Sequence, residues 1–106
     1  MARHLSYASV LILQAIAAGV RHGFDIIDTA GLPSGTVYPA LGKLEAAGLV
    51  QSRWEDARTA QREKRPTRRY YELRPAGVRA LDEALERLRS LERASSERRT
   101  TAKARP

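Results

Sequence analysis

The side chains in this chain that are best suited to chemistry are basic residues gathered in one short segment. Residues 51–71 contain seven basic and three acidic side chains, whereas residues 1–50 contain three of each. Clustered guanidinium and ammonium groups create a local positive field that attracts polyanions and neutralises phosphates. The basic side chains predicted to do this are Arg58, Arg62, Lys64, Arg65, Arg68 and Arg69. The alternative interpretation is a charged loop that is only solvated.

A second candidate set lies in the segment SGTVYPALGKLEAAGLV, which begins at Ser34. Val37, Leu41 and Leu44 recur at helical spacing and predict a buried face. Hydroxyl groups and a lysine on the other face can contact phosphates and base edges, and a tyrosine can stack or donate a hydrogen bond. The outward side chains are then Ser34, Thr36, Tyr38, Lys43 and Glu45. An ordinary solvated face, with Ser34 acting only as a helix cap, is the alternative.

Catalytic and metal sites are not predicted. The chain has no cysteine, and His4 and His22 are too few and too isolated for a metal site, so we interpret them as surface or satisfied histidines. The acidic residues near the candidate set, Asp25, Asp28 and Glu45, occupy structural helix positions and do not form a nucleophile, base and orienter set. We therefore expect no enzyme activity, no metal and no cofactor.

Length and composition predict one folded domain. The chain has 106 residues, 42% of them hydrophobic and 29% charged, with a net charge of +7. This is typical of a globular protein of one domain, with a polyanion as its natural partner. The absence of cysteine is compatible with a reducing cytoplasm, where we expect the protein to be. The apolar stretch 7–18 after Arg3 leaves a secretory signal as an alternative, although Gln14 interrupts it and about a dozen apolar residues cannot span a bilayer.

Hydrophobic spacing predicts the elements that position the candidate residues. Helices are expected over 5–18, over 22–30 and from Ser34 to Gly48, with an irregular first turn or a slight bend caused by Pro39. Residues 49–55 and 69–73 alternate as strands, and 56–67 is expected to be a long exposed hairpin loop. Core packing is the expected role of the aromatic side chains Tyr7, Trp54, Tyr70 and Tyr71.

The last part of the chain predicts a helix that starts at Pro75. An apolar stripe repeats every three or four residues and is expected to form a homodimer interface. Its members are Val78, Leu81, Leu85 and Leu88. Residues 95–106 are polar and basic and are expected to be a disordered tail.

These elements predict a mainly α fold with a small β-hairpin, of class α+β. The order helix, helix, turn, helix, strand, loop, strand describes a winged helix-turn-helix over residues 1–74. A dimerisation helix, 75–94, is expected to pack on the same domain.

Four stretches of the sequence resemble the PadR family of bacterial transcriptional regulators. They are LILQAIAAG followed by HGFDI, then SGTVYPALGKLEAAGLV, then RRYYEL, and finally RPAG at the start of a helix. The second is the most specific, because the run Gly-Thr-Val-Tyr-Pro at the start of a recognition helix, followed by Leu-x-x-Leu-Glu and Gly-Leu-Val, is that family's signature. Together the stretches cover about residues 8–78.

The resemblance implies a third helix in the DNA major groove, a wing on the DNA backbone and a C-terminal helix that forms a dimer. It also implies repression relieved by a small-molecule effector, whose identity the sequence does not give. We therefore expect a homodimeric repressor on a pseudo-palindromic operator in double-stranded DNA. A winged helix used as a protein-interaction module, or as a nucleic-acid binder without sequence preference, is the alternative.

Overall fold

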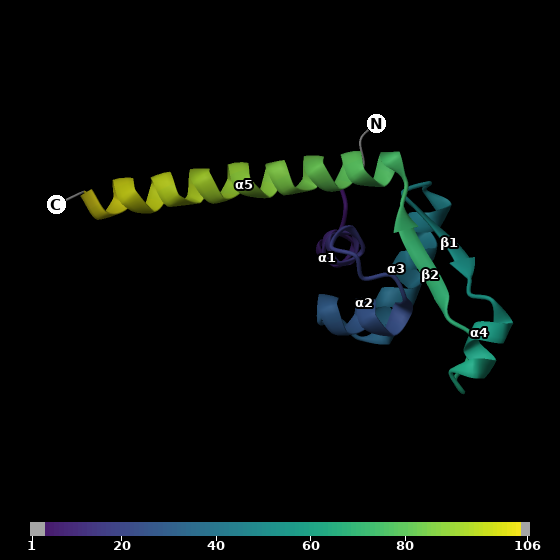
Figure 1. Cartoon of the computed structure of the whole chain (residues 1–106). Helices are drawn as coiled ribbons and strands as arrows, with labels where there is room; N and C mark the ends of the chain where they lie inside the picture. Colours follow the sequence, from purple (N-terminus) through teal and green to yellow (C-terminus); the bar gives the residue numbers. More distant parts are fainter. Residues whose placement is uncertain (1–3, 105–106) are drawn as a thin grey trace.

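The protein is an arrangement of helices around one β-hairpin (Figure 1). The computed structural model describes residues 4–104, with side-chain surroundings for residues 4–98. This confirms the predicted α+β class. The elements in order are α1 (Tyr7–Ala17), α2 (Gly23–Ala30), α3 (Ser34–Ala46), β1 (Val50–Trp54), α4 (Ala57–Arg62), β2 (Arg69–Leu73) and α5 (Pro75–Ala104).

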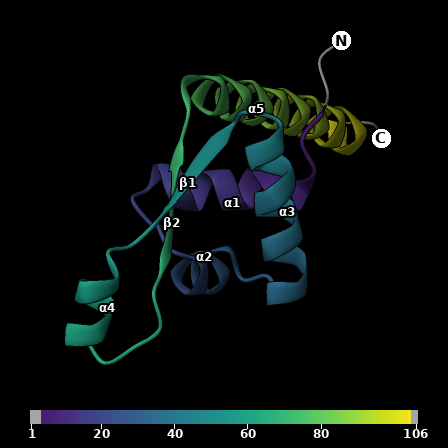
Figure 2. The ribbon, with the colours of Figure 1, turned by 90° about the vertical axis from the view of Figure 1, so that its right-hand side faces the viewer.

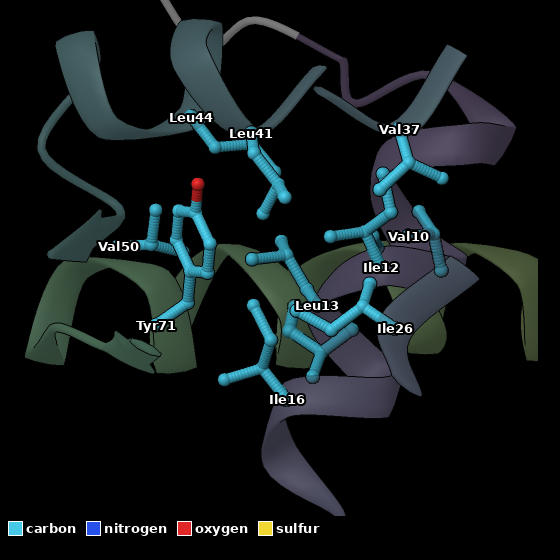
Figure 3. Close-up of a cluster of buried hydrophobic side chains, with 12 residues drawn as sticks. Val10, Ile12, Leu13, Ile16, Ile26, Val37, Leu41, Leu44, Val50 and Tyr71 are labelled. Atoms are coloured by element: carbon cyan, nitrogen blue, oxygen red, sulfur yellow. The ribbon is translucent and has the colours of Figure 1, made fainter. Parts of the chain in front are cut away.

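Helix α1 is the centre of the core. It begins at Ser6, whose hydroxyl accepts a hydrogen bond from the backbone N–H of Ser9 at 3.1 Å. It contacts α2, α3, α5 and β2, so Ile12 and Leu13 are fully buried (Figure 3). Burial of each such side chain stabilises the fold by about 1.5–3 kcal/mol.

The hairpin is joined to the helices along β2. Strands β1 and β2 are antiparallel, with Val50 opposite Leu73 and Trp54 opposite Arg69. The backbone N–H of Tyr71 donates to the carbonyl of Arg21 at 2.7 Å, and the neighbouring His22 forms a bridge with Tyr70. The hairpin is therefore joined to the segment before α2 at the middle of β2, and the connection between its two strands lies beyond this junction.

Helix α3 has the buried face that the sequence predicted, formed by Val37, Leu41 and Leu44. It runs through Pro39 as one helix. The alternative in which Ser34 acts as the helix cap is wrong, because Pro33 is the capping residue and no side chain caps the helix. The carbonyl of Pro33 instead accepts the backbone N–H groups of Thr36 and Val37.

The segment 56–67, which we expected to be an exposed loop, contains the short helix α4. Its start is capped by Asp56, whose carboxylate accepts the backbone N–H of Arg58 at 2.9 Å. Ala60 is only 3% exposed and is the buried residue of this short helix. The prediction failed because one small apolar residue is a weak signal within a highly charged segment.

Helix α5 continues past the point where a disordered tail was expected. Residues 95–104 are helical, so that prediction was wrong for them, and residues 105–106 lie outside the described residues. Low hydrophobicity argues against burial but not against helix formation. This segment contains alanine, arginine and glutamate, without glycine or proline, and it extends a helix that is already nucleated.

The apolar stripe of α5 is buried in its middle, whereas Val78 at its start is 45% exposed and the side chains beyond Leu85, including Leu91 next to the stripe, are exposed as well. Leu81 is 5% exposed and Ala84 6% exposed, because both pack into their own domain. Leu88 and Leu91, further along, are 39% and 61% exposed, where α5 projects beyond the other helices (Figure 1). Leu81 therefore cannot be the interface residue that we expected, since it presents almost no surface to a partner.

Two of the aromatic side chains expected in the core are exposed. Tyr7 is 72% and Trp54 62% exposed, whereas Tyr71 is buried as predicted and Tyr70 is half-buried. Trp54 shares a strand face with the buried Val50. Its distance from the core is the reason for the error, because it lies at the outer end of β1, beyond the helices that cover Val50.

No helix among residues 4–104 is both long and apolar enough to cross a bilayer.

Candidate nucleic-acid interface

The outward face of α3 is a ridge of small residues. At helical periodicity Gly35, Pro39, Gly42 and Ala46 follow one another along the side opposite the buried Leu44, and all four are exposed. A Cβ atom added to Gly35 or Gly42 would meet no other atom within 4 Å. Packing therefore does not require these glycines. The sequence interpretation missed this ridge, although the spacing of four, three and four residues is visible in it.

Polar side chains flank this ridge of α3. Ser34, Thr36 and Lys43 are exposed, as the sequence predicted. Tyr38 is 44% exposed and leans towards α2, where its hydroxyl would lie only 2.6 Å from a Cβ atom added to Gly23. Glu45, also expected to face outward, instead accepts a hydrogen bond from Ser52 at 2.6 Å. The free outward face therefore carries a lysine and no unpaired carboxylate.

The wing consists of β1, α4, β2 and the segment 63–68 that joins α4 to β2. Figure 2 shows α4 at the end of the hairpin away from α5, the same end of the molecule as α2 and the start of α3. Arg58, Arg62 and Lys64 are exposed there. Among the described residues, the Arg62 guanidinium makes only a long hydrogen bond of 3.4 Å to Thr59. These three cations are therefore available to a ligand.

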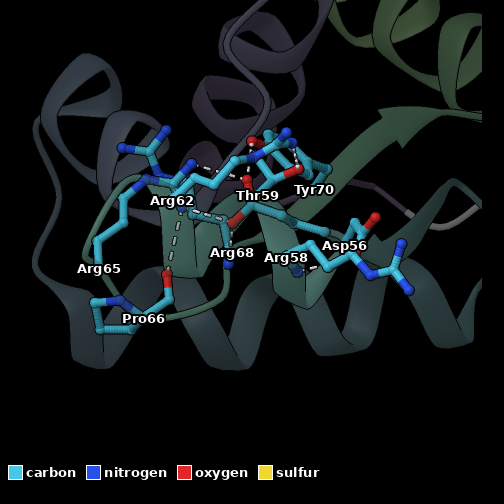
Figure 4. Close-up of polar contacts among 9 residues, drawn as sticks. Asp56, Arg58, Thr59, Arg62, Arg65, Pro66, Arg68 and Tyr70 are labelled. Carbon is cyan, nitrogen blue, oxygen red and sulfur yellow. Dashed lines mark hydrogen bonds and ion pairs between the residues drawn. The ribbon is translucent and has the colours of Figure 1, made fainter.

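Arg65 has a different environment, because it binds a buried carboxylate. Its guanidinium donates to both carboxylate oxygens of Glu55, at 2.5 and 2.8 Å (Figure 4). Glu55 also accepts the backbone N–H of Arg68 and the hydroxyl of Tyr70, both at 3.1 Å. The hydrogen bonds from Arg65 lower the pKa of the Glu55 carboxyl from 4.5 to about 2, against the opposing effect of burial. This ion pair connects the end of β1 to the segment after α4.

Arg69 is also held in place by its neighbours. Its Nε donates to the hydroxyl of Ser52 at 2.9 Å, and its Nη2 lies 3.3 Å from Glu45. Its guanidinium carbon is 5.4 Å from the centroid of the Trp54 ring. The guanidinium of Arg68, in contrast, forms no ion pair within the described part of the chain.

The structure brings several of the predicted DNA-binding residues together around one cleft of about 500 Å³. Tyr38 lies on the α3 side, and Arg65, Arg68 and Arg69 lie on the wing side. Lys43, Arg62 and Lys64 are outside this cleft. The residues of the α5 stripe belong to a separate surface. The remaining lining residues are His22, Gly23, Phe24, Trp54, Pro66, Thr67 and Tyr71.

Groups of three or more potential metal ligands do not occur among the described residues.

The fold is shared with solved structures of transcriptional regulators. A PadR family transcription regulator from Clostridium difficile R20291 superposes with a TM-score of 0.75 at 21% identity, covering 87% of this chain and 97% of that one. A transcriptional regulator from Clostridium thermocellum, Cth-833, has a TM-score of 0.71 at 19% identity, covering 86% and 88%. The regulator BldR from Sulfolobus solfataricus has a TM-score of 0.71 at 29% identity, covering 86% of this chain and 60% of that one.

Curated protein sequences gave no match to the chain. The sequence model of the transcriptional regulator PadR-like family, however, matches residues 12–83. That match includes α2, α3 and the wing, and it confirms the resemblance seen in the sequence. Members of this family are transcriptional regulators and not enzymes, as we expected for this chain. The chain therefore belongs to the PadR-like family of transcriptional regulators.

Proposed function

We propose that this protein is a cytoplasmic, homodimeric repressor that binds a pseudo-palindromic operator in double-stranded DNA. The observation that carries the proposal is the pairing of a small, nearly neutral ridge on α3 with a basic wing at the same end of the molecule. Shape and base contacts give sequence preference, and phosphate contacts give affinity.

The ridge on α3 supports a role for this helix in recognising the DNA sequence. The glycines at 35 and 42 allow the helix backbone to come close to the floor of the major groove. Thr36 and Lys43 on one flank, and Tyr38 and Ser34 on the other, can then reach base edges and phosphates. Because α3 contains one lysine and one glutamate, its attraction to DNA in general is weak.

The wing supports a role in binding the phosphate backbone of DNA. Its exposed cations, Arg58, Arg62 and Lys64, have no carboxylate partner in the described residues and can neutralise phosphates. Arg68, which is half-exposed and lines the same cleft as Tyr38, can reach the same backbone. Arg65 already binds Glu55, so we assign it to positioning the wing and not to contact with DNA.

The exposed part of the α5 stripe supports the dimer. Leu88 and Leu91 are apolar and uncovered, and Leu85 is half-buried beside them. A second copy related by a two-fold axis would cover both stripes. The two α3 helices would then face half-sites one or two helical turns apart.

Footprinting on the DNA upstream of the protein's own gene tests the DNA-binding proposal. We expect two protected half-sites, with much weaker binding to random DNA of equal length. Equal affinity for both DNAs would instead indicate a binder without sequence preference. The absence of any salt-sensitive DNA binding would indicate a protein-interaction module.

Light scattering tests the dimer separately. The double change Leu88→Arg and Leu91→Arg should give a folded monomer, because it places unpaired charges in the proposed interface. The control is Ser90→Arg, which adds a positive charge to the same part of α5 away from the stripe and should remain dimeric. If the double variant stays dimeric, the interface lies elsewhere.

A further inference from the structure

The hydrogen bonds of Glu45 join α3 to both strands of the wing. Glu45 is the only carboxylate of α3, and its Oε2 accepts the hydroxyl of Ser52 on β1 at 2.6 Å. Its Oε1 accepts Nη2 of Arg69 on β2 at 3.3 Å, and the Nε of Arg69 donates to the hydroxyl of Ser52 at 2.9 Å. The three side chains therefore form a closed ring of hydrogen bonds, which we call the Glu45 triad.

The Glu45 triad adds a polar connection to the apolar one between the helices and the wing. Val50 and Tyr71 belong to the core cluster that contains Leu44. Arg69 lies two residues from Tyr71 along β2, in the direction of α4. Among the described residues, no side-chain hydrogen bond outside the triad joins α3 to the wing. A wing attached at Tyr71 alone is free to tilt, whereas a second attachment beyond Tyr71 fixes its direction.

Two aromatic rings hold the guanidinium of Arg69 in the triad. Its guanidinium carbon lies 5.4 Å from the centroid of the Trp54 ring and 6.0 Å from that of the Tyr71 ring. Both rings attract a cation and restrict its position. This arrangement gives the exposed Trp54 a role that core packing does not, because it keeps Arg69 beside Glu45 and Ser52.

We propose that the Glu45 triad fixes the direction of the wing relative to α3 and thereby makes the protein selective for its operator. Phosphate contacts set the position of a protein on DNA, and base contacts read the sequence. A wing held at one angle to α3 places this helix on the bases whenever the wing binds phosphates. A wing that tilts can bind phosphates while α3 is displaced from the bases.

Glu45, Ser52 and Arg69 are positioning residues in this proposal, since they act through α3 and the wing and not by contact with DNA. Selectivity for the operator rests on the proposed function, whereas the direction of the wing does not. The contribution of the triad to stability should be small, because the side chains of Arg69 and Glu45 are 42% and 34% exposed and water screens their charges. Variants of the triad should therefore fold, with melting temperatures close to that of the unchanged protein.

Ser52→Ala tests selectivity, because it removes the central hydroxyl without changing the net charge. Its affinity for the operator should fall by about fivefold or more, since α3 and the wing are no longer held in the orientation that binds. Its affinity for random DNA of equal length and its salt dependence should stay unchanged. The control is Ser52→Thr, which keeps a hydroxyl and should bind both DNAs like the unchanged protein. Equal losses on the two DNAs, or in the two variants, would overturn the proposal.

Arg69→Lys distinguishes positioning from direct contact with a phosphate. Lysine keeps the positive charge but lacks the planar guanidinium that donates to Ser52 and Glu45 together. Operator affinity should fall as it does in Ser52→Ala, and the double variant should bind no more weakly than either single variant, because both changes open the same ring. If Arg69→Lys retains full affinity for both DNAs, Arg69 is not a positioning residue.

The direction of the wing can be measured without DNA. Residual dipolar couplings of backbone N–H groups report in NMR how α3 and the wing are oriented relative to one another. One alignment should fit both elements in the unchanged protein, whereas the wing couplings of Ser52→Ala should be smaller than that alignment requires. Couplings that do not change in Ser52→Ala would show that the triad does not fix the wing. If the protein binds no DNA, the proposed function and the selectivity fail together, and the couplings still decide whether the triad holds the wing.

Discussion

Helix α3 and the wing lie at the same end of the molecule and differ in how they use charge. α3 contains one lysine and one glutamate, and its outward ridge consists of small residues. The wing segment 51–71 contains seven basic and three acidic side chains. Two of those acids organise the wing itself, since Glu55 holds Arg65 and Asp56 caps α4. The comparison indicates that shape serves recognition in α3, whereas the charge of the wing is divided between internal structure and attraction of phosphate.

The largest effect is expected from a bulky side chain on the ridge of α3. Gly42→Leu should reduce operator affinity by more than about tenfold, because the leucine would stand between the helix backbone and the groove. The fold should be as stable as before or more stable, since leucine favours a helix more than glycine does by roughly 0.5–1 kcal/mol. DNA titration and thermal unfolding measure the two effects independently.

The matched control at this position is Gly42→Ala, which gives a similar gain in helix stability with a much smaller side chain. It should retain most of the operator affinity. If Gly42→Leu also binds normally, the ridge does not approach the groove and α3 is not the reading element.

The next effect is expected from Lys43 on the flank of α3. Lys43→Ala should cost about 1–3 kcal/mol on the operator and much less on random DNA, because the lysine is expected to bind a base edge. Competition titrations with both DNAs give the ratio of the two affinities. An equal reduction on both would assign Lys43 to a phosphate and weaken the contrast between α3 and the wing.

A smaller effect is expected in the wing, and it should be insensitive to sequence. Arg62→Gln should weaken binding to operator and random DNA equally and lower the slope of log affinity against log salt by about one. Arg65→Gln removes the same charge in the same segment, but that charge is already neutralised by Glu55. Its salt slope should therefore stay close to that of the unchanged protein. Equal slopes for the two variants would show that Arg62 and Arg65 contribute equally to phosphate binding, so the wing charges would not be divided between internal structure and DNA contact.

Much of the fold could be predicted from the sequence, because buried faces repeat regularly. The spacing of Val37, Leu41 and Leu44 predicted α3, and the alternation around Tyr71 predicted β2. The errors lie where the chain is far from the core. Trp54 and Tyr7 have side chains typical of a core but lie at its edges, where no neighbouring element covers them. Sequence spacing tells which face a residue shares, but not whether another element reaches it.

The candidate site was predictable in its residue types but not in its pairings. All the wing arginines looked equivalent in the sequence, since charge alone was visible there. Glu55 lies ten residues before Arg65, and only the return of the chain after α4 brings their side chains together. The ridge of small residues on α3 was not predicted for a different reason. Glycine, proline and alanine have no side-chain group that could bind a base or a phosphate, so their residue types do not indicate a binding surface.

The smallest effect under ordinary conditions concerns the pH dependence of the wing. The pKa of the Glu55 carboxyl is lowered to about 2 in the folded protein, from 4.5 without these contacts. Because the folded pKa is the lower one, ionisation of Glu55 stabilises the fold fully above pH 4.5. This contribution declines below that pH and is lost once the pH falls below about 2.

Glu55→Gln isolates this contribution, because it removes the charge but keeps the shape of the side chain. The variant should unfold at a lower temperature than the unchanged protein at pH 7, and the difference should be constant between pH 8 and about 5. It should shrink as the pH is lowered towards 2, since protonation then neutralises Glu55 in the unchanged protein as well. All other carboxyl groups are common to both proteins, so their titration cancels in the difference. Equal melting temperatures at pH 7 would show that Arg65 is not held by Glu55. Arg65 would then be one more free cation of the wing, and the division of charge that distinguishes the wing from α3 would be lost.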